Sequence, residues 1–150
     1  MRALTLTQPW AGLVAAGIKL IENRPRKIIS SAHFGSRIAI HASREIDREA
    51  YDDIYRIDPR TDIRMVSADA PWPRLSHITN AVIAVATVVR VVEDPRELGE
   101  HARWYFGPIG YVLSDVRALV APVPCRGRIG LWTMPAAVEL AVCAQIGDAP

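Results

Sequence analysis

The chain has few of the residues on which disulfide-rich, metal-binding and membrane-spanning proteins depend. Its 150 residues include two cysteines, Cys125 and Cys143, and four scattered histidines, which excludes a disulfide framework and gives no zinc-binding pattern. No apolar run reaches the roughly 20 residues of a transmembrane helix, and polar residues follow Arg2 where a secretory signal would be apolar. These absences predict one cytoplasmic globular domain over residues 1–150, with no metal, no cofactor and no membrane partner.

Acidic residues are almost missing from the first third of the chain. Residues 1–44 contain seven lysines or arginines and one acid, Glu22, whereas residues 45–101 carry a net charge of −5 and residues 102–150 a net charge of +1. A basic segment of this kind is typical of a surface that faces an anion such as nucleic acid. The alternative is that the basic and acidic segments attract each other across the fold.

The apolar pattern predicts an α+β fold, a small β-barrel of about five to six strands flanked by helices. The run Asn80–Val92 is rich in β-branched residues, which favours a long buried strand over a helix. Further strands are expected at Leu4–Thr7, Arg37–Ser43, 110–116, 118–124 and 127–132. Helices are expected between Pro9 and Gly17, from an N-cap at Ser43 to Ile57, and at Pro135–Gly147.

The segment LTLTQPWAGLVAAGIKLIENRPRK (residues 4–27) is similar to the opening motif of the ASCH domain, a member of the PUA-like superfamily. The matching pattern is Gln8-Pro9-Trp10-Ala11 followed by Gly17-x-Lys19-x-x-Glu22-x-Arg24. RIAIHAS (37–43), WYFGPIGYVL (104–113) and PVPCRGRIGLW (122–132) also resemble this family, whereas residues 51–75 have no counterpart in it. The resemblance implies a PUA-like barrel and a module that binds nucleic acid, above all RNA. A few relatives are enzymes, an amidohydrolase on acylated cytidine and a ribonuclease.

Lys19, Glu22 and Arg24 form the central candidate site. Alternation along a strand places Glu22 and Arg24 on one face, and Lys19 joins them only if the turn at Ile18 directs it there. The two cations can hold phosphate or base acceptors, while Glu22 can accept from an amino group such as that of cytosine. The alternative is a set of charges that neutralise one another at a rim, worth at most about 1 kcal/mol. The family motif favours the functional interpretation.

A hydrolase would require a nucleophile and a base among the same residues. In the amidohydrolase-type relatives the pattern resembles Gly-x-Lys-x-x-Thr-x-Arg, with the lysine activating the threonine hydroxyl, whereas this chain has Glu22 at the nucleophile position. Lys19 and Glu22 are the catalytic candidates if the chain is a hydrolase, but a nearby carboxylate is expected to keep Lys19 protonated, the wrong state for a base. Binding is therefore favoured over catalysis. A protein-interaction domain with a vestigial pocket is the third alternative.

Other residues are candidates for contact with a nucleic acid, in particular a single-stranded or modified RNA. Trp10 can stack on a base or pack in the core, and the aromatic cluster of Trp104, Tyr105 and Phe106 can form the floor of a base pocket or anchor a loop. His41 and Ser43 precede a predicted helix, where free N–H groups attract an anion, although Ser43 can also serve only as a cap. The remaining candidates are Gln8, Arg26, Lys27, Arg37, Arg126 and Arg128.

Overall fold

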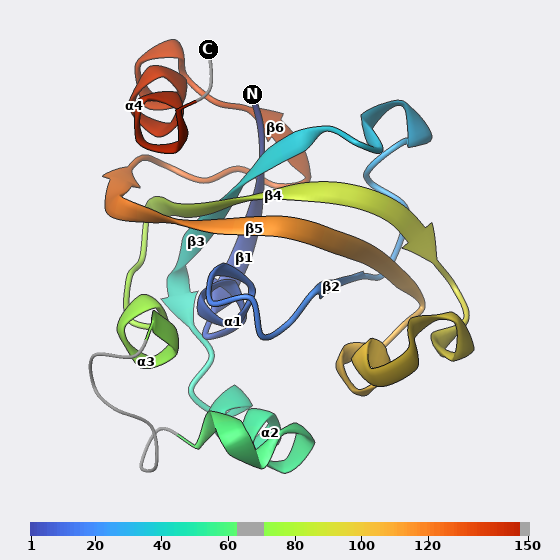
Figure 1. Cartoon of the computed structure of the whole chain (residues 1–150). Coiled ribbons are helices and arrows are strands. Elements are labelled where there is room, and N and C mark those ends of the chain that lie inside the picture. The colour runs from blue at the N-terminus through green and yellow to red at the C-terminus, as the bar shows by residue number, and fades with distance from the viewer. Residues whose placement is uncertain (63–70, 148–150) are drawn as a thin grey trace.

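The computed structural model describes residues 1–62 and 71–147, and one mixed six-stranded sheet organises this part of the chain (Figure 1). The strand order is β2-β5-β4-β3-β1-β6, and only β1 and β3 pair in parallel. The strands are β1 (Arg2–Gln8), β2 (Ile21–Arg24), β3 (Arg37–Ile46), β4 (Ala81–Val92), β5 (Ile109–Pro124) and β6 (Leu131–Thr133). The α-helices are α1 (Trp10–Ala15), α2 (Ala50–Ile57), α3 (Pro71–Leu75) and α4 (Ala136–Ile146), and 3₁₀ helices occupy Ser31–His33, Pro59–Thr61 and Pro95–Trp104.

The predicted α+β fold with six strands is confirmed, and the sheet is curved but open. Its two edge strands, β2 and β6, pair only with β5 and β1 within the described residues, so the ladder does not close. The helix α1 lies against the sheet between β2 and β3 (Figure 1) and contacts four of the strands. The helix therefore covers one face of the curved sheet.

Apolar residues of alternating strand positions supply a core on each face of the sheet. One face packs against α1 through Leu4, Ile38, Ile83 and Val14. The opposite face packs against α4 through Ala3, Ala39, Val82 and Val142. Because successive strand residues point to opposite faces, Ala3 and Leu4 enter different cores. Among the described helices, none is both long enough and apolar enough to cross a bilayer.

Two predicted element boundaries are wrong. The strand that begins at Arg37 continues to Ile46, and the carboxylate of Asp47, not Ser43, accepts hydrogen bonds from the N–H groups of Glu49 and Ala50 at the start of α2. The Ser43 hydroxyl instead bonds locally with the backbone of Glu45. The segments 110–116 and 118–124 form one strand, β5, which stays paired to β4 through several register shifts.

Candidate functional site

The short strand β2 presents Glu22 and Arg24 side by side. It pairs with β5 in antiparallel register, Glu22 opposite Tyr111 and Arg24 opposite Ile109. The Arg24 Nη2 atom lies 2.9 Å from Glu22 Oε1, which confirms that the two side chains share a face of the strand. Glu22 is buried and Arg24 partly buried, so this ion pair lies within the wall of the molecule and not at a solvated rim.

The turn after α1 directs Lys19 toward the same carboxylate. Gly17 has a φ of +73°, the left-handed conformation that glycine adopts at a helix end, and the N–H groups of Ile18 and Lys19 both donate to the carbonyl of Leu13. Lys19 Nζ then lies 3.4 Å from Glu22 Oε2 and donates to the carbonyl of Ile21. The structure therefore brings together all three residues of the sequence motif.

Burial and the neighbouring carboxylate act in opposite directions on the pKa of Lys19. Burial lowers the pKa of the Lys19 ammonium below its ordinary value; the charge and hydrogen bond of Glu22 oppose this effect, and the charge of Arg24 adds to it. The sequence predicts that the carboxylate favours the protonated form of Lys19, and Glu22 does act in that direction. Because only 2% of Lys19 is exposed, burial is the larger effect on its pKa.

A cavity of about 280 Å³, called the first cavity here, opens beside this cluster. Its lining combines Lys19, Glu22 and Arg24 with Trp10, Phe106 and the threonines Thr5 and Thr7. The rings of Trp10 and Phe106 meet edge to face with centroids 5.7 Å apart, and Lys19 Nζ lies 5.9 Å from the Trp10 centroid. The first cavity thus combines an aromatic wall with polar groups, and its volume is just below the range typical of ligand pockets, about 300 to 1,000 Å³.

A second cavity of about 490 Å³ adjoins the first, and Thr5 and Arg24 line both. It brings together four of the predicted residues, His41, Ser43, Arg126 and Arg128, with the unpredicted Arg44 and Asn80. Arg24 Nη2 donates to the carbonyl of Thr5 at 2.8 Å, which fixes the guanidinium at the border between the two cavities. The two cavities therefore belong to one surface of the molecule.

Two of the predicted binding residues are structural. Gln8 is fully buried; its amide Nε2 donates to the carbonyls of Leu75 and Ile78, and its Oε1 accepts from the N–H of Gly12. Trp104 is 1% exposed and packs in a third apolar cluster that includes Ile54 of α2 and Val92 of β4. Neither side chain lines either of the two cavities, so the predictions that Gln8 contacts a ligand and that Trp104 forms the floor of a base pocket are corrected.

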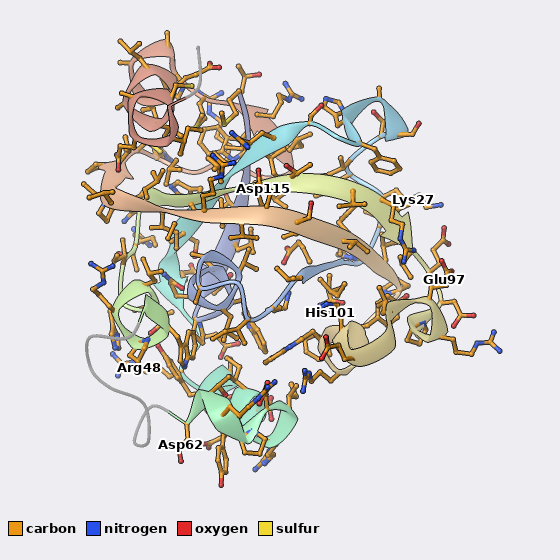
Figure 2. The ribbon with its side chains drawn as sticks, viewed as in Figure 1. Lys27, Arg48, Asp62, Glu97, His101 and Asp115 are labelled. Atoms are coloured by element: carbon orange, nitrogen blue, oxygen red, sulfur yellow. The ribbon has the colours of Figure 1, made fainter. Side chains whose placement is uncertain are left out.

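Three predicted cations lie away from both cavities. Lys27 pairs with Glu93 near the end of β4, and Arg37 pairs with Asp115 at 2.6 Å; Figure 2 shows Lys27 and Asp115 at different parts of the sheet. Arg26 is exposed and is not part of the lining of either cavity. The anion site expected at His41 and Ser43 does not lie at a helix start, because β3 runs on past both residues.

Sequence reasoning missed the residues that hold the aromatic wall in place. The Asn23 amide donates from Nδ2 to the carbonyl of Trp104, and its Oδ1 accepts from the N–H of Phe106. Asn23 lies between Glu22 and Arg24 in the motif, but the sequence does not indicate its role because its partner, Phe106, is 83 residues away. The aromatic cluster at 104–106 was the one signal for Phe106, which is 52% exposed.

Comparison with known proteins adds a fold assignment. No family model and no curated protein matches the chain. Among solved structures, an ASCH protein from Zymomonas mobilis is similar over 95% of this chain and 93% of its own, with a TM-score of 0.56 and 14% sequence identity. Two single-substitution mutants of that protein give TM-scores of 0.57 at the same identity, over 96% and 94% of their own length. The chain therefore has the ASCH fold that its opening motif predicts.

Proposed function

We propose that the chain is a nucleic-acid-binding domain that prefers single-stranded RNA and receives one base in the first cavity. The fold supports this proposal, because the ASCH motif implies a nucleic-acid-binding module. The observation that carries it is the composition of the first cavity, which is lined by the aromatic rings of Trp10 and Phe106 together with the Glu22–Arg24 ion pair. Stacking on such a wall is worth about 1–3 kcal/mol per base.

The polar side of the first cavity suits a base that carries an amino group. Among the described residues, each oxygen of Glu22 has one cationic partner, Lys19 or Arg24, and keeps a lone pair for a further donor. The Nε atom of Arg24 has no hydrogen-bond partner among the described residues and can donate to a carbonyl or ring nitrogen. An acceptor beside a donor matches the exocyclic amino group and adjacent acceptor of cytosine.

Binding of labelled single-stranded RNA, followed by fluorescence anisotropy across a salt series, tests the proposal. We expect affinity to fall steeply between about 50 and about 200 mM salt, as phosphate contacts require. Oligocytidine should bind more tightly than oligouridine, and Glu22→Gln should reduce that difference. Absence of salt-sensitive RNA binding at low salt would refute the proposal, and equal binding of DNA would remove the preference for RNA.

One observation favours a second function, hydrolysis of a modified nucleoside or of RNA. Lys19 is buried, its pKa is lowered, and its Nζ lies 3.4 Å from Glu22 in the wall of the cavity. A lysine with a lowered pKa can act as a base at neutral pH. Incubation with acylated cytidines and with RNA, comparing the wild type with Lys19→Met, tests this function. Activity that Lys19→Met leaves unchanged would exclude this site.

A further inference from the structure

The second cavity is lined by four arginines, Arg24, Arg44, Arg126 and Arg128, and by no carboxylate. Most other arginines of the described chain lie against an acid, for example Arg90 with Glu97 at 3.0 Å, as well as Arg56, Arg60, Arg96, Arg103 and Arg117. Arg44, Arg126 and Arg128, by contrast, have no carboxylate partner within 4.0 Å among the residues that the structure describes. Their charge is therefore left for an anion from outside the chain.

The wall that carries Arg126 and Arg128 is built around a buried histidine. The backbone of Gly127 lies against the His41 ring so closely that a Cβ atom there would be 2.5 Å from His41 Cε1. His41 is 1% exposed, meets Trp132 edge to face at 5.7 Å and bonds through Nε2 to the carbonyl of Cys125 at 3.0 Å. This contact holds the backbone between the two arginines against His41, at the edge of the cavity.

One polar group in this wall can donate to an anion. The Nδ1 atom of His41 is buried and has no hydrogen-bond partner among the described residues; because Nε2 donates to Cys125, Nδ1 is an acceptor and does not bind an anion. The Thr5 hydroxyl accepts from Trp132 Nε1 at 3.0 Å, and no acceptor for its own hydrogen is found in the described part of the chain. Thr5 lies at the border of the two cavities and can donate to a group that spans them.

We infer that the second cavity binds a phosphate group of the nucleotide whose base occupies the first cavity. Guanidinium groups match phosphate because their planar forks donate two parallel hydrogen bonds to its oxygens. Arg24 and Thr5 line both cavities, so a nucleotide with its base in the first cavity and its phosphate in the second can contact both residues. The inference rests on the proposed function and deepens it: the ligand is a nucleotide or an RNA phosphodiester and not a free nucleoside.

The test compares ligands that differ only in phosphate. Titrations of the full chain with cytidine, with its 5′- and 3′-monophosphates and with a short oligocytidine RNA would be followed by NMR chemical shifts. The variant is R126A/R128A, whose side chains are exposed and without acid partners. The matched control is R90A/R96A, which removes the same charge at the Glu97 corner of the molecule (Figure 2). Arg90 lies ten residues along β4 from Asn80, about 33 Å in an extended strand.

We expect at least one monophosphate to bind about tenfold more tightly than cytidine. R126A/R128A should abolish this gain and leave cytidine binding unchanged, whereas R90A/R96A should keep the gain. With the RNA, R126A/R128A should reduce the slope of log affinity against log salt by about 0.7, the value for one phosphate of a single strand. A reduced slope together with the monophosphate gain assigns the site to a backbone phosphate; the gain without a slope change assigns it to a free nucleotide.

Two results would overturn the inference. The first is equal binding of cytidine and both monophosphates by the wild type, together with an unchanged RNA salt slope in R126A/R128A. The second is an equal loss in R126A/R128A and in R90A/R96A, which would show a general effect of charge. In either case, RNA binding by the wild type would leave the proposed function standing. Failure of the wild type to bind RNA would refute the proposed function, whatever the mononucleotides do.

Discussion

Replacing Gln8 by leucine should destabilise the protein strongly without acting on the ligand site directly. The Gln8 amide is fully buried and makes three hydrogen bonds with backbone groups: to Leu75 O at 2.7 Å, to Ile78 O at 2.6 Å and from Gly12 N at 2.9 Å. These bonds connect the end of β1 to the first turn of α1, to the last residue of α3 and to the segment that follows α3. Gln8→Leu keeps an apolar side chain of similar length and removes all three.

The size of the effect follows from the groups left behind. The N–H of Gly12 lies in the first turn of α1 and has no partner within the helix, and Ile78 O also loses its Gln8 donor. Leu75 O retains a long bond of 3.4 Å from Ile78 N. At about 1–3 kcal/mol for each of these two unsatisfied groups, the cost is about 2–6 kcal/mol. For a chain of this length, about 3 °C per kcal/mol gives a fall in Tm of about 6–18 °C.

Urea denaturation followed by circular dichroism measures this cost, and Gln145→Leu is the matched control. Gln145 also makes two backbone hydrogen bonds, with Ala121 at 2.9 Å each, but they are exposed to water. Water can replace them, so Gln145→Leu should cost less than about 1 kcal/mol. The reasoning is refuted if Gln8→Leu stays within about 1 kcal/mol of the wild type. It is also refuted if the variant keeps its stability and loses RNA binding.

Three other predictions concern the two cavities. Burial lowers the pKa of His41 below its ordinary value of 6.5, so the unfolded chain takes up the proton first as the pH falls. The contribution of neutral His41 to the free energy of unfolding should therefore be fully present at neutral pH and decrease below about pH 6.5. Urea titrations should show this decrease in the wild type and a smaller one in His41→Gln. Glu22→Gln removes the charge that raises the pKa of Lys19, so NMR of the Lys19 side chain should show titration at a still lower pH, and a rise would contradict the assignment. Phe106→Ala should change stability little, because Phe106 is 52% exposed, yet weaken RNA binding by about five- to 100-fold through lost stacking, as anisotropy would show.

Features whose signal lies within a few residues could be predicted from the sequence. Pro9 and Gly17 bracket α1 as expected, and the β-branched run from Asn80 forms β4. The shared face of Glu22 and Arg24 follows from the two-residue period of a strand. In each case the determining contacts are local, so the pattern and the structure agree.

Features that depend on distant partners could not be predicted. The buried amide of Gln8 donates to carbonyl groups 67 and 70 residues away, and no local pattern distinguishes that glutamine from an exposed one. The pKa of Lys19 depends on a balance between burial and a neighbouring charge, and the depth of burial is a property of the fold. Ser43 and Asp47 are both good helix caps, and the choice between them follows from the pairing of β3 with β1, which extends to Ile46 opposite Gln8.

The two hydrogen bonds of the Asn23 amide have a consequence for how a ligand would be bound. Asn23 ties the backbone at Trp104 and Phe106 to the same short strand that carries Glu22 and Arg24. The backbone that carries Phe106 and the strand that carries Glu22 and Arg24 are thus fixed relative to each other before any ligand binds. A base that enters need not order a loop, and so loses less conformational entropy on binding. The cavity is preorganised, and discrimination between bases then depends on fit and hydrogen bonding, with little cost for closing a loop around the ligand.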